Sequence, residues 1–141
     1  MRRIFWDAML FVYLLGDCQE FTQHVDKLLT RSRKRGDLLF SSCLALGEVM
    51  AGSERLNQPA VAVEARDTLT EIGFRFLPFD EGAISIFSEL RGKQRLKIAD
   101  AIHLACAGSA GIDLFLTGDR QLLKLDVPGI QFIAEFNTPI L

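Results

Sequence analysis

Four acidic residues stand at positions in the chain where an acid needs an explanation. Asp7 interrupts an apolar N-terminal stretch, and Glu48 lies within a predicted helix. Asp100 falls in the first turn of an apolar segment with helical spacing, and Asp119 closely follows the buried-strand pattern at 114–116. Carboxylates that share a site raise one another's pKa unless a cation is bound. Oxygen ligands without His or Cys favour a hard cation, Mg²⁺ or Mn²⁺, which activates water and stabilises a phosphoryl transition state.

The elements that must position these acids alternate between strand and helix patterns. Strands are predicted at 3–6, 38–40, 74–79, 114–116 and 131–133, and helices at about 10–15, 20–35, 43–52, 59–72, 80–90 and 97–108. Ser41 or Ser42 is the expected cap of the third helix, and Asp80 that of the fifth. This alternation, with no repeat or linker, predicts one α/β domain over 1–141, a three-layer sandwich with a mostly parallel sheet.

The topology of such a sheet determines where the acids can meet. In open parallel sheets, functional sites form at the carboxyl ends of the strands. Asp7 follows the first strand and Asp119 the fourth. If these two strands are neighbours, all four acids can converge on one edge of the sheet.

Composition narrows the class of protein. The chain has 141 residues, 49% hydrophobic and 24% charged, an ordinary globular balance with enough length for a core. No apolar run approaches the roughly 18 residues of a membrane span, and the N-terminus lacks a small-residue cleavage site, so we expect a cytoplasmic protein. The cysteines Cys18, Cys43 and Cys106 are odd in number and show no C-x-x-C spacing, which argues against disulfides and zinc. Cys43 and Cys106 are expected in the core.

The net charge of −2 does not by itself indicate a nucleic-acid binder, so any such binding depends on local patches. Basic residues at 91, 93, 95 and 97 lead directly into Asp100. A cationic segment beside an acidic metal site suits an RNA backbone, with Arg95 and Lys97 as the expected contacts. A second basic run, at 31–35, ends a helix, where cations complement the helix dipole.

The order Asp7, Glu48, Asp100, Asp119 resembles that of PIN-domain ribonucleases, especially the VapC toxins of bacterial and archaeal toxin–antitoxin pairs. The most specific part is Ala-Asp-Ala-Ile-His-Leu-Ala-Cys-Ala at 99–107 followed by Leu-Thr-Gly-Asp ending at Asp119, close to the family pattern D-A-x-x-x-A-x-A … L-x-T-x-D. The resemblance covers essentially the whole chain. It implies a parallel sheet of about five strands, order 3-2-1-4-5, and metal-dependent endonucleolytic cleavage of RNA.

The resemblance also implies roles for residues and partners. The four acids would be catalytic and would hold Mg²⁺ or Mn²⁺, and Thr117 would support them by hydrogen bonding. A homodimer and a small VapB-like antitoxin that inserts a segment over the acidic groove are implied. The apolar residues of the helix at 20–35 and the region 44–56 are the expected contact surfaces.

Other interpretations remain open at this stage. Asp100 and Asp119 could serve only as helix-terminal acids, and Glu48 could be a solvated surface residue. His103 matches no catalytic position of the family and is interpreted as a helix-surface or partly buried histidine. Ala8 and Met9 stand where the family usually has polar residues, which leaves a catalytically degenerate domain that binds RNA or protein as the alternative function. A phosphotransfer receiver domain is set aside because Asp7 has no adjacent acid.

Overall fold

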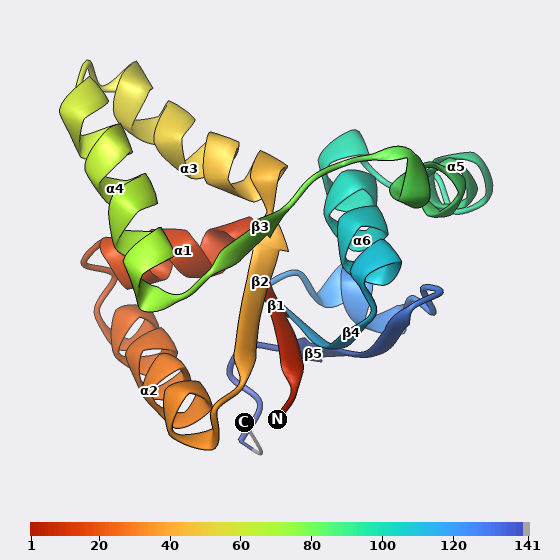
Figure 1. Cartoon of the computed structure of the whole chain (residues 1–141), viewed down its shortest axis with the longest axis horizontal. Coiled ribbons are helices and arrows are strands. Elements are labelled where there is room, and N and C mark those ends of the chain that lie inside the picture. The colour runs from red at the N-terminus through yellow and green to blue at the C-terminus, as the bar shows by residue number, and fades with distance from the viewer. Residues whose placement is uncertain (140–141) are drawn as a thin grey trace.

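The computed structural model describes residues 1–139, which form a parallel sheet covered by helices on both faces (Figure 1). The strands are β1 (Arg3–Trp6), β2 (Leu38–Ser42), β3 (Arg75–Leu77), β4 (Ile112–Thr117) and β5 (Ile130–Glu135). The helices are α1 (Ala8–Leu15), α2 (Glu20–Arg35), α3 (Cys43–Arg55), α4 (Pro59–Ile72), α5 (Ile84–Lys93) and α6 (Ile98–Ala110), with 3₁₀ turns η1 (Glu81–Ala83) and η2 (Arg120–Lys124). The strand order is β3-β2-β1-β4-β5, all pairs are parallel, and the expected α/β sandwich is therefore confirmed.

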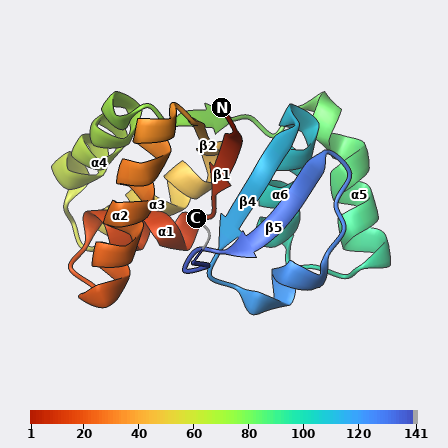
Figure 2. The same ribbon diagram turned by 90° about the horizontal axis from the view of Figure 1, so that it is seen from below.

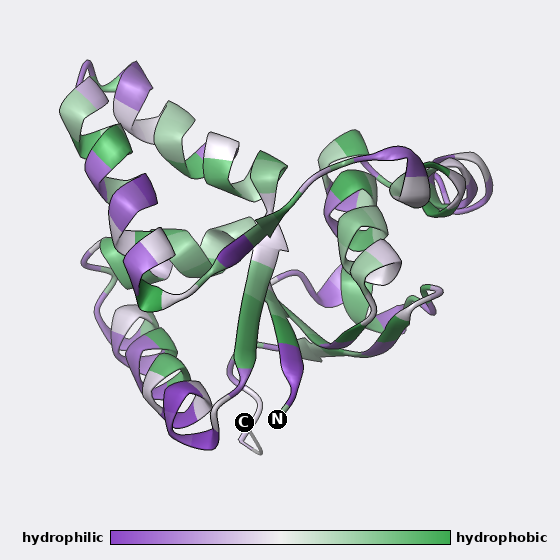
Figure 3. Cartoon of the chain, viewed as in Figure 1, coloured by the Kyte–Doolittle hydropathy of each residue, from purple (hydrophilic) through white to green (hydrophobic). Residues whose placement is uncertain are grey.

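The two faces of the sheet carry separate cores, because successive strand residues point to opposite sides. Ile4 and Trp6 of β1 pack in the core under α1–α4, whereas Phe5 packs in the core under α5 and α6. Figure 2 shows α5 and α6 on one side of the sheet and α1–α4 on the other. Figure 3 shows the hydrophobic residues gathered on the strands and on the inner sides of the helices. Both faces are thus buried, as a parallel sheet requires.

Pairing between β1 and β4 brings the two acidic strand ends together. Trp6 lies in register with Leu116, and the Asp7 N–H donates to the Leu116 carbonyl at 2.9 Å. The chain then leaves both strands at the same edge, with Asp7 at the start of α1 and Asp119 at the start of η2. The sequence-based expectation that the first and fourth strands are neighbours is confirmed.

The predicted helix caps are correct for α3 and wrong for the fifth helix. Of the two candidate serines, Ser42 caps α3 by accepting the Ala45 N–H at 2.9 Å, while the Ser41 hydroxyl donates to the Trp6 carbonyl. The prediction that Asp80 caps a helix is wrong, because its side chain makes no capping hydrogen bond and η1 intervenes before α5.

Two further expectations concern burial. Cys106 is buried as predicted, but Cys43 is exposed at the first position of α3, so its placement in the core is wrong. In the apolar stripe of α2, Val25, Leu28 and Leu29 are buried in the core, and Phe21 is the member that stays exposed as a possible contact. Within 1–139, no helix is both long and apolar enough to cross a bilayer.

Candidate active site

Asp7 is held from two sides at the end of β1. As the N-cap of α1, its Oδ1 accepts the Ala8 N–H at 2.9 Å. Its Oδ2 accepts the hydroxyl of Thr117 at 2.8 Å. The backbone of Ala8 therefore supplies one of the polar contacts to Asp7, although the Ala8 side chain offers none.

Thr117, the last residue of β4, links two of the acids. Its side chain is fully buried, and its hydroxyl oxygen also accepts the Asp119 N–H at 3.0 Å. The Asp119 Oδ1 accepts the Gln121 N–H at 2.9 Å, so this acid does cap a short helix while it lies beside Asp7. One buried hydroxyl thus positions both strand-end aspartates.

Asp100 reaches the same edge from the first turn of α6. Burial raises the pKa of its carboxyl, and the negative charges of Asp7 and Asp119 raise it further. Electrostatic interactions with His103 and Lys97 partly offset this increase in the Asp100 pKa. The three aspartates therefore lie within electrostatic range of one another, as converging acids must.

Glu48 reaches its position in a different way. It lies on α3 with 46% of its side chain exposed, and its Oε1 is 2.9 Å from Nε2 of His103. His103 is only 3% exposed, and its Nδ1 is 2.7 Å from Oγ of Ser42. The prediction of a helix-surface or partly buried histidine is therefore wrong. Glu48 is not among the charges that shift the Asp100 pKa, so its convergence with the aspartates stays a prediction.

The sequence contained only a weak signal for His103. It lies one helical turn after Asp100 among residues that read as the buried side of α6. Its partners come from the end of β2 and from α3, far away along the chain. Only the packing of α6 against these elements shows that the ring is a hydrogen-bonded core group.

The expected RNA contacts lie on the loop that enters α6. Lys97 is exposed and close enough to Asp100 to lower its pKa. Arg95 is exposed too, with a left-handed φ of 55°, and the loop is folded back by a hydrogen bond from Arg91 to the Leu96 carbonyl at 2.7 Å. The loop therefore presents two exposed cationic side chains, of which Lys97 lies near Asp100.

The three aspartates provide suitable ligand atoms for a metal ion, but their side chains are not placed around one common point. Asp7, Asp100 and Asp119 offer only carboxylate oxygens, the ligands preferred by Mg²⁺ and Mn²⁺. Over the described range 1–139, however, no three His, Cys, Asp or Glu side chains are already placed to hold one ion. The donor set therefore suits a hard cation by its chemistry.

Comparison with known proteins identifies the family. The model of the PIN domain matches residues 4–128, most of the chain. The chain belongs to the PIN domain family. No curated protein matches the sequence significantly.

Solved structures show the same PIN fold at low sequence identity. VapBC2 from Rickettsia felis, bound to a DNA fragment from its promoter, aligns with a TM-score of 0.72 and 12% identity over 94% of this chain and 97% of that one. VapC20 of Mycobacterium tuberculosis, a toxin that cleaves the sarcin–ricin loop, aligns with a TM-score of 0.66 and 18% identity over 87% and 96% of the two chains. FitAcB from Neisseria gonorrhoeae gives a TM-score of 0.64 and 20% identity over 82% and 87%.

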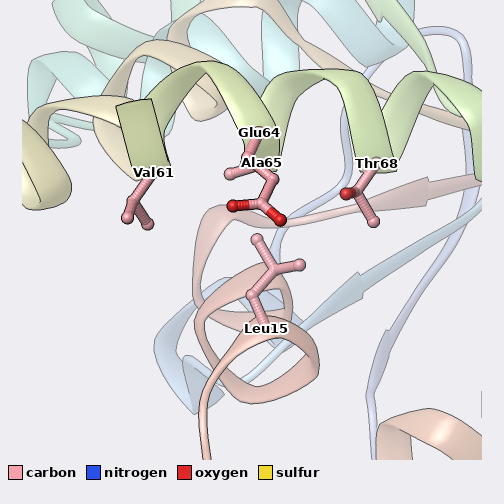
Figure 4. A pocket seen from close by; sticks show the side chains of 5 residues that line it. All are labelled: Leu15, Val61, Glu64, Ala65 and Thr68. Carbon is pink, nitrogen blue, oxygen red and sulfur yellow. The ribbon is translucent and has the colours of Figure 1, made fainter. Parts of the chain in front are cut away.

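This PIN domain also carries an apolar groove that reaches Glu48. A cavity of about 440 Å³ lies between α1, α3 and α4. The hydrophobic residues that line it are Phe11, Val12, Leu15, Val49, Leu56, Val61 and Ala65. A smaller pocket of about 230 Å³ shares Leu15 and Val61 with it and runs along α4, where Leu15 faces Glu64 and Thr68 (Figure 4). The helices 8–15 and 43–55 thus present a concave apolar surface next to one of the candidate site residues.

Proposed function

We propose that this PIN domain is a metal-dependent endoribonuclease and the toxin of a VapBC-type toxin–antitoxin pair. The observation that carries the proposal is the meeting of Asp7, Asp100 and Asp119 at one sheet edge, where burial and mutual repulsion raise the pKa of Asp100. A family whose members cleave RNA with a divalent ion would need such a cluster. Membership of the PIN family supports the nuclease, and the toxin structures with the same fold support the toxin assignment.

In this proposal the four acids share one task and Thr117 has another. Asp7, Asp100, Asp119 and Glu48 hold the cation, and Thr117 keeps Asp7 and Asp119 in place through its two hydrogen bonds. A bound Mg²⁺ or Mn²⁺ would supply a water of lowered pKa and a positive charge opposite the phosphoryl oxygens. The carboxylates that hold the ion would also position the attacking water.

Substrate binding is assigned to the cationic loop before α6. Arg95 and Lys97 are exposed, and Lys97 lies near Asp100. An RNA backbone that contacts these side chains would have a phosphate close to the acidic edge. A folded RNA of the kind named for VapC20 is a reasonable first substrate to test.

We further propose that a small antitoxin occupies the apolar groove of α1, α3 and α4. The groove extends to Glu48, so a segment lying in it would end at the acids. Val12, Leu15 and Leu56 in this groove are exposed, as expected of a surface that is covered in a complex. A homodimer and a cytoplasmic location, both expected from the sequence, belong to the same proposal.

The decisive experiment incubates the purified protein with a mixed RNA pool that includes ribosomal RNA, with Mg²⁺ or Mn²⁺ and with EDTA. Asp100→Asn is compared with Asp26→Asn, which changes an exposed acid on α2 in the same chemical way. We expect cleavage that needs both the metal ion and Asp100, and full activity in the Asp26 variant.

The opposite results are equally informative. Cleavage retained in Asp100→Asn, or in EDTA, would refute the proposed site. If no RNA is cleaved, calorimetry with Mg²⁺ and Mn²⁺ shows whether the protein binds metal at all. Protein that neither binds metal nor cleaves would favour the degenerate binding module that Ala8 and Met9 suggest.

A further inference from the structure

We propose that His103 is a positioning residue that holds Glu48 in the active site, as the middle member of a chain Ser42–His103–Glu48. The inference rests on the proposed function only in treating Glu48 as a metal ligand. The chain itself is defined by two contacts, 2.7 Å from Ser42 Oγ to Nδ1 and 2.9 Å from Nε2 to Glu48 Oε1. These two contacts connect Ser42 at the end of β2, His103 in the middle of α6 and Glu48 on α3.

The hydrogen-bonding capacity of the partners fixes the proton on the ring. An ionised carboxylate only accepts hydrogen bonds, so Nε2 carries a proton whether the imidazole is neutral or cationic. The Ser42 oxygen already accepts the Ala45 N–H at 2.9 Å, which leaves its own proton for Nδ1 of a neutral ring. The order of donation is then Ala45 N–H to Ser42, Ser42 O–H to His103, and His103 Nε2–H to Glu48.

The burial of the three side chains shows what the chain does. Ser42 is fully buried and His103 is 3% exposed, whereas Glu48 is 46% exposed. A buried serine that caps a helix cannot meet a substrate, which excludes the Ser-His-acid arrangement of a covalent hydrolase. The exposed end of this hydrogen-bonded series is the Glu48 carboxylate, which His103 contacts through Oε1.

An exposed glutamate without support would sample many rotamers, and fixing it costs side-chain entropy at the moment of metal binding. The bond from a rigid, buried imidazole fixes Glu48 in advance. Because His103 lies one turn after Asp100 on α6, the same helix presents one acid and orients another. The hydrogen-bond partners of metal-binding carboxylates commonly contribute 10- to 100-fold in affinity.

The test compares His103→Leu, which keeps apolar volume but has no donor, with His103→Gln, whose amide can accept from Ser42 and donate to Glu48. His24→Leu is the matched control, since His24 is the only other histidine and lies exposed on α2. The readouts are Mg²⁺ affinity by calorimetry, the split of cleavage kinetics between kcat and KM for RNA, and unfolding by urea. Long-range ¹H–¹⁵N spectra of the wild-type ring report which nitrogen is protonated without any metal or substrate.

We expect a protonated Nε2, Mg²⁺ affinity about 10- to 100-fold weaker in His103→Leu, and recovery to within a few-fold in His103→Gln. At saturating Mg²⁺, KM for RNA should stay unchanged, because His103 does not touch RNA. An unprotonated Nε2, or wild-type Mg²⁺ affinity in His103→Leu, would overturn the proposal even if the wild-type protein cleaves RNA. A wild-type protein that binds Mg²⁺ through this chain but cleaves no RNA would refute the ribonuclease and leave the role of His103 standing.

Discussion

Replacing Thr117 by Val tests whether one hydroxyl organises the two strand-end aspartates. The substitution keeps the shape of the side chain and removes its hydroxyl. Two hydrogen bonds disappear, the 2.8 Å donation to Asp7 and the 3.0 Å acceptance from the Asp119 N–H. The residue is fully buried at the end of β4, so no water replaces the hydroxyl at its own position.

The size of the effect follows from these contacts. A hydrogen bond to a charged group contributes about 1.5–3 kcal/mol, and a buried N–H left without a partner costs about 1–3 kcal/mol. Both aspartates are only half-buried, so water recovers part of each loss. We therefore expect the free energy of unfolding to fall by about 2 kcal/mol. With a urea slope of roughly 2 kcal/mol per molar, the unfolding midpoint should fall by about 1 M.

The single tryptophan makes this measurement direct. Trp6 is fully buried next to Asp7, so its fluorescence reports the unfolding of the sheet around the site. Thr30→Val is the matched control, because the Thr30 hydroxyl is exposed and bonds only to a carbonyl of its own helix. That variant should stay within about 0.5 kcal/mol of the wild type. If Thr117→Val also stays within that limit, the hydroxyl does not hold the aspartates and the argument for the site's preorganisation fails.

Two further predictions concern stability alone. Burial and neighbouring charges raise the pKa of Asp100 above its ordinary 3.8, so ionisation of Asp100 lowers the free energy of unfolding. This loss of stability is absent below the unfolded-state pKa and fully present above the folded-state pKa. Asp100→Asn should therefore be more stable than the metal-free wild type near pH 7, with a difference that disappears as urea unfolding is repeated toward pH 3.8; equal stability at both pH values would contradict this. A Cβ at Gly108 would collide with the backbone at Pro128, so Gly108→Ala should cost more than about 3 kcal/mol of unfolding free energy or prevent folding. Gly47 lies in an open position inside α3, so Gly47→Ala should raise the free energy of unfolding by up to about 1 kcal/mol. If urea unfolding followed by circular dichroism showed Gly108→Ala to be more stable than Gly47→Ala, the contact between α6 and Pro128 would be looser than described.

Local signals in the sequence were sufficient for both limits of two helices, α2 and α4. The predicted helix 20–35 matches α2, and it ends at Gly36, whose φ of 73° suits glycine. The start of α4 at Pro59 was predicted for the same kind of reason, since proline fits the first turn of a helix. These features depend on a few neighbouring residues, so the sequence alone contains them.

Features that depend on distant partners were predicted less well. β5 extends over Ile130–Glu135, longer than the expected 131–133, because it pairs with β4 along its whole length. β3 contracts to Arg75–Leu77, because it is an edge strand paired on one side only and Pro78 follows it without an N–H. The burial of His103 belongs to this group as well. The positions of Asp7, Asp100 and Asp119 were identified because their order along the chain already resembled a known family, and their catalytic roles stay predictions.

The arrangement of α6 explains why the acids and the buried histidine occur together. An acid at the start of a helix gains from the helix dipole, which favours Asp100 in its ionised form, while burial and two nearby aspartates oppose it. In the proposed function, a bound cation would relieve the repulsion between these three charges. His103, one turn later on α6, contacts Glu48. A rotation of α6 by one residue, about 100°, would move Asp100 away from the other two aspartates and His103 away from Glu48. The packing of α6 in the core through Ala101, Leu104 and Ala107 therefore determines the geometry of the site as much as the acids themselves do.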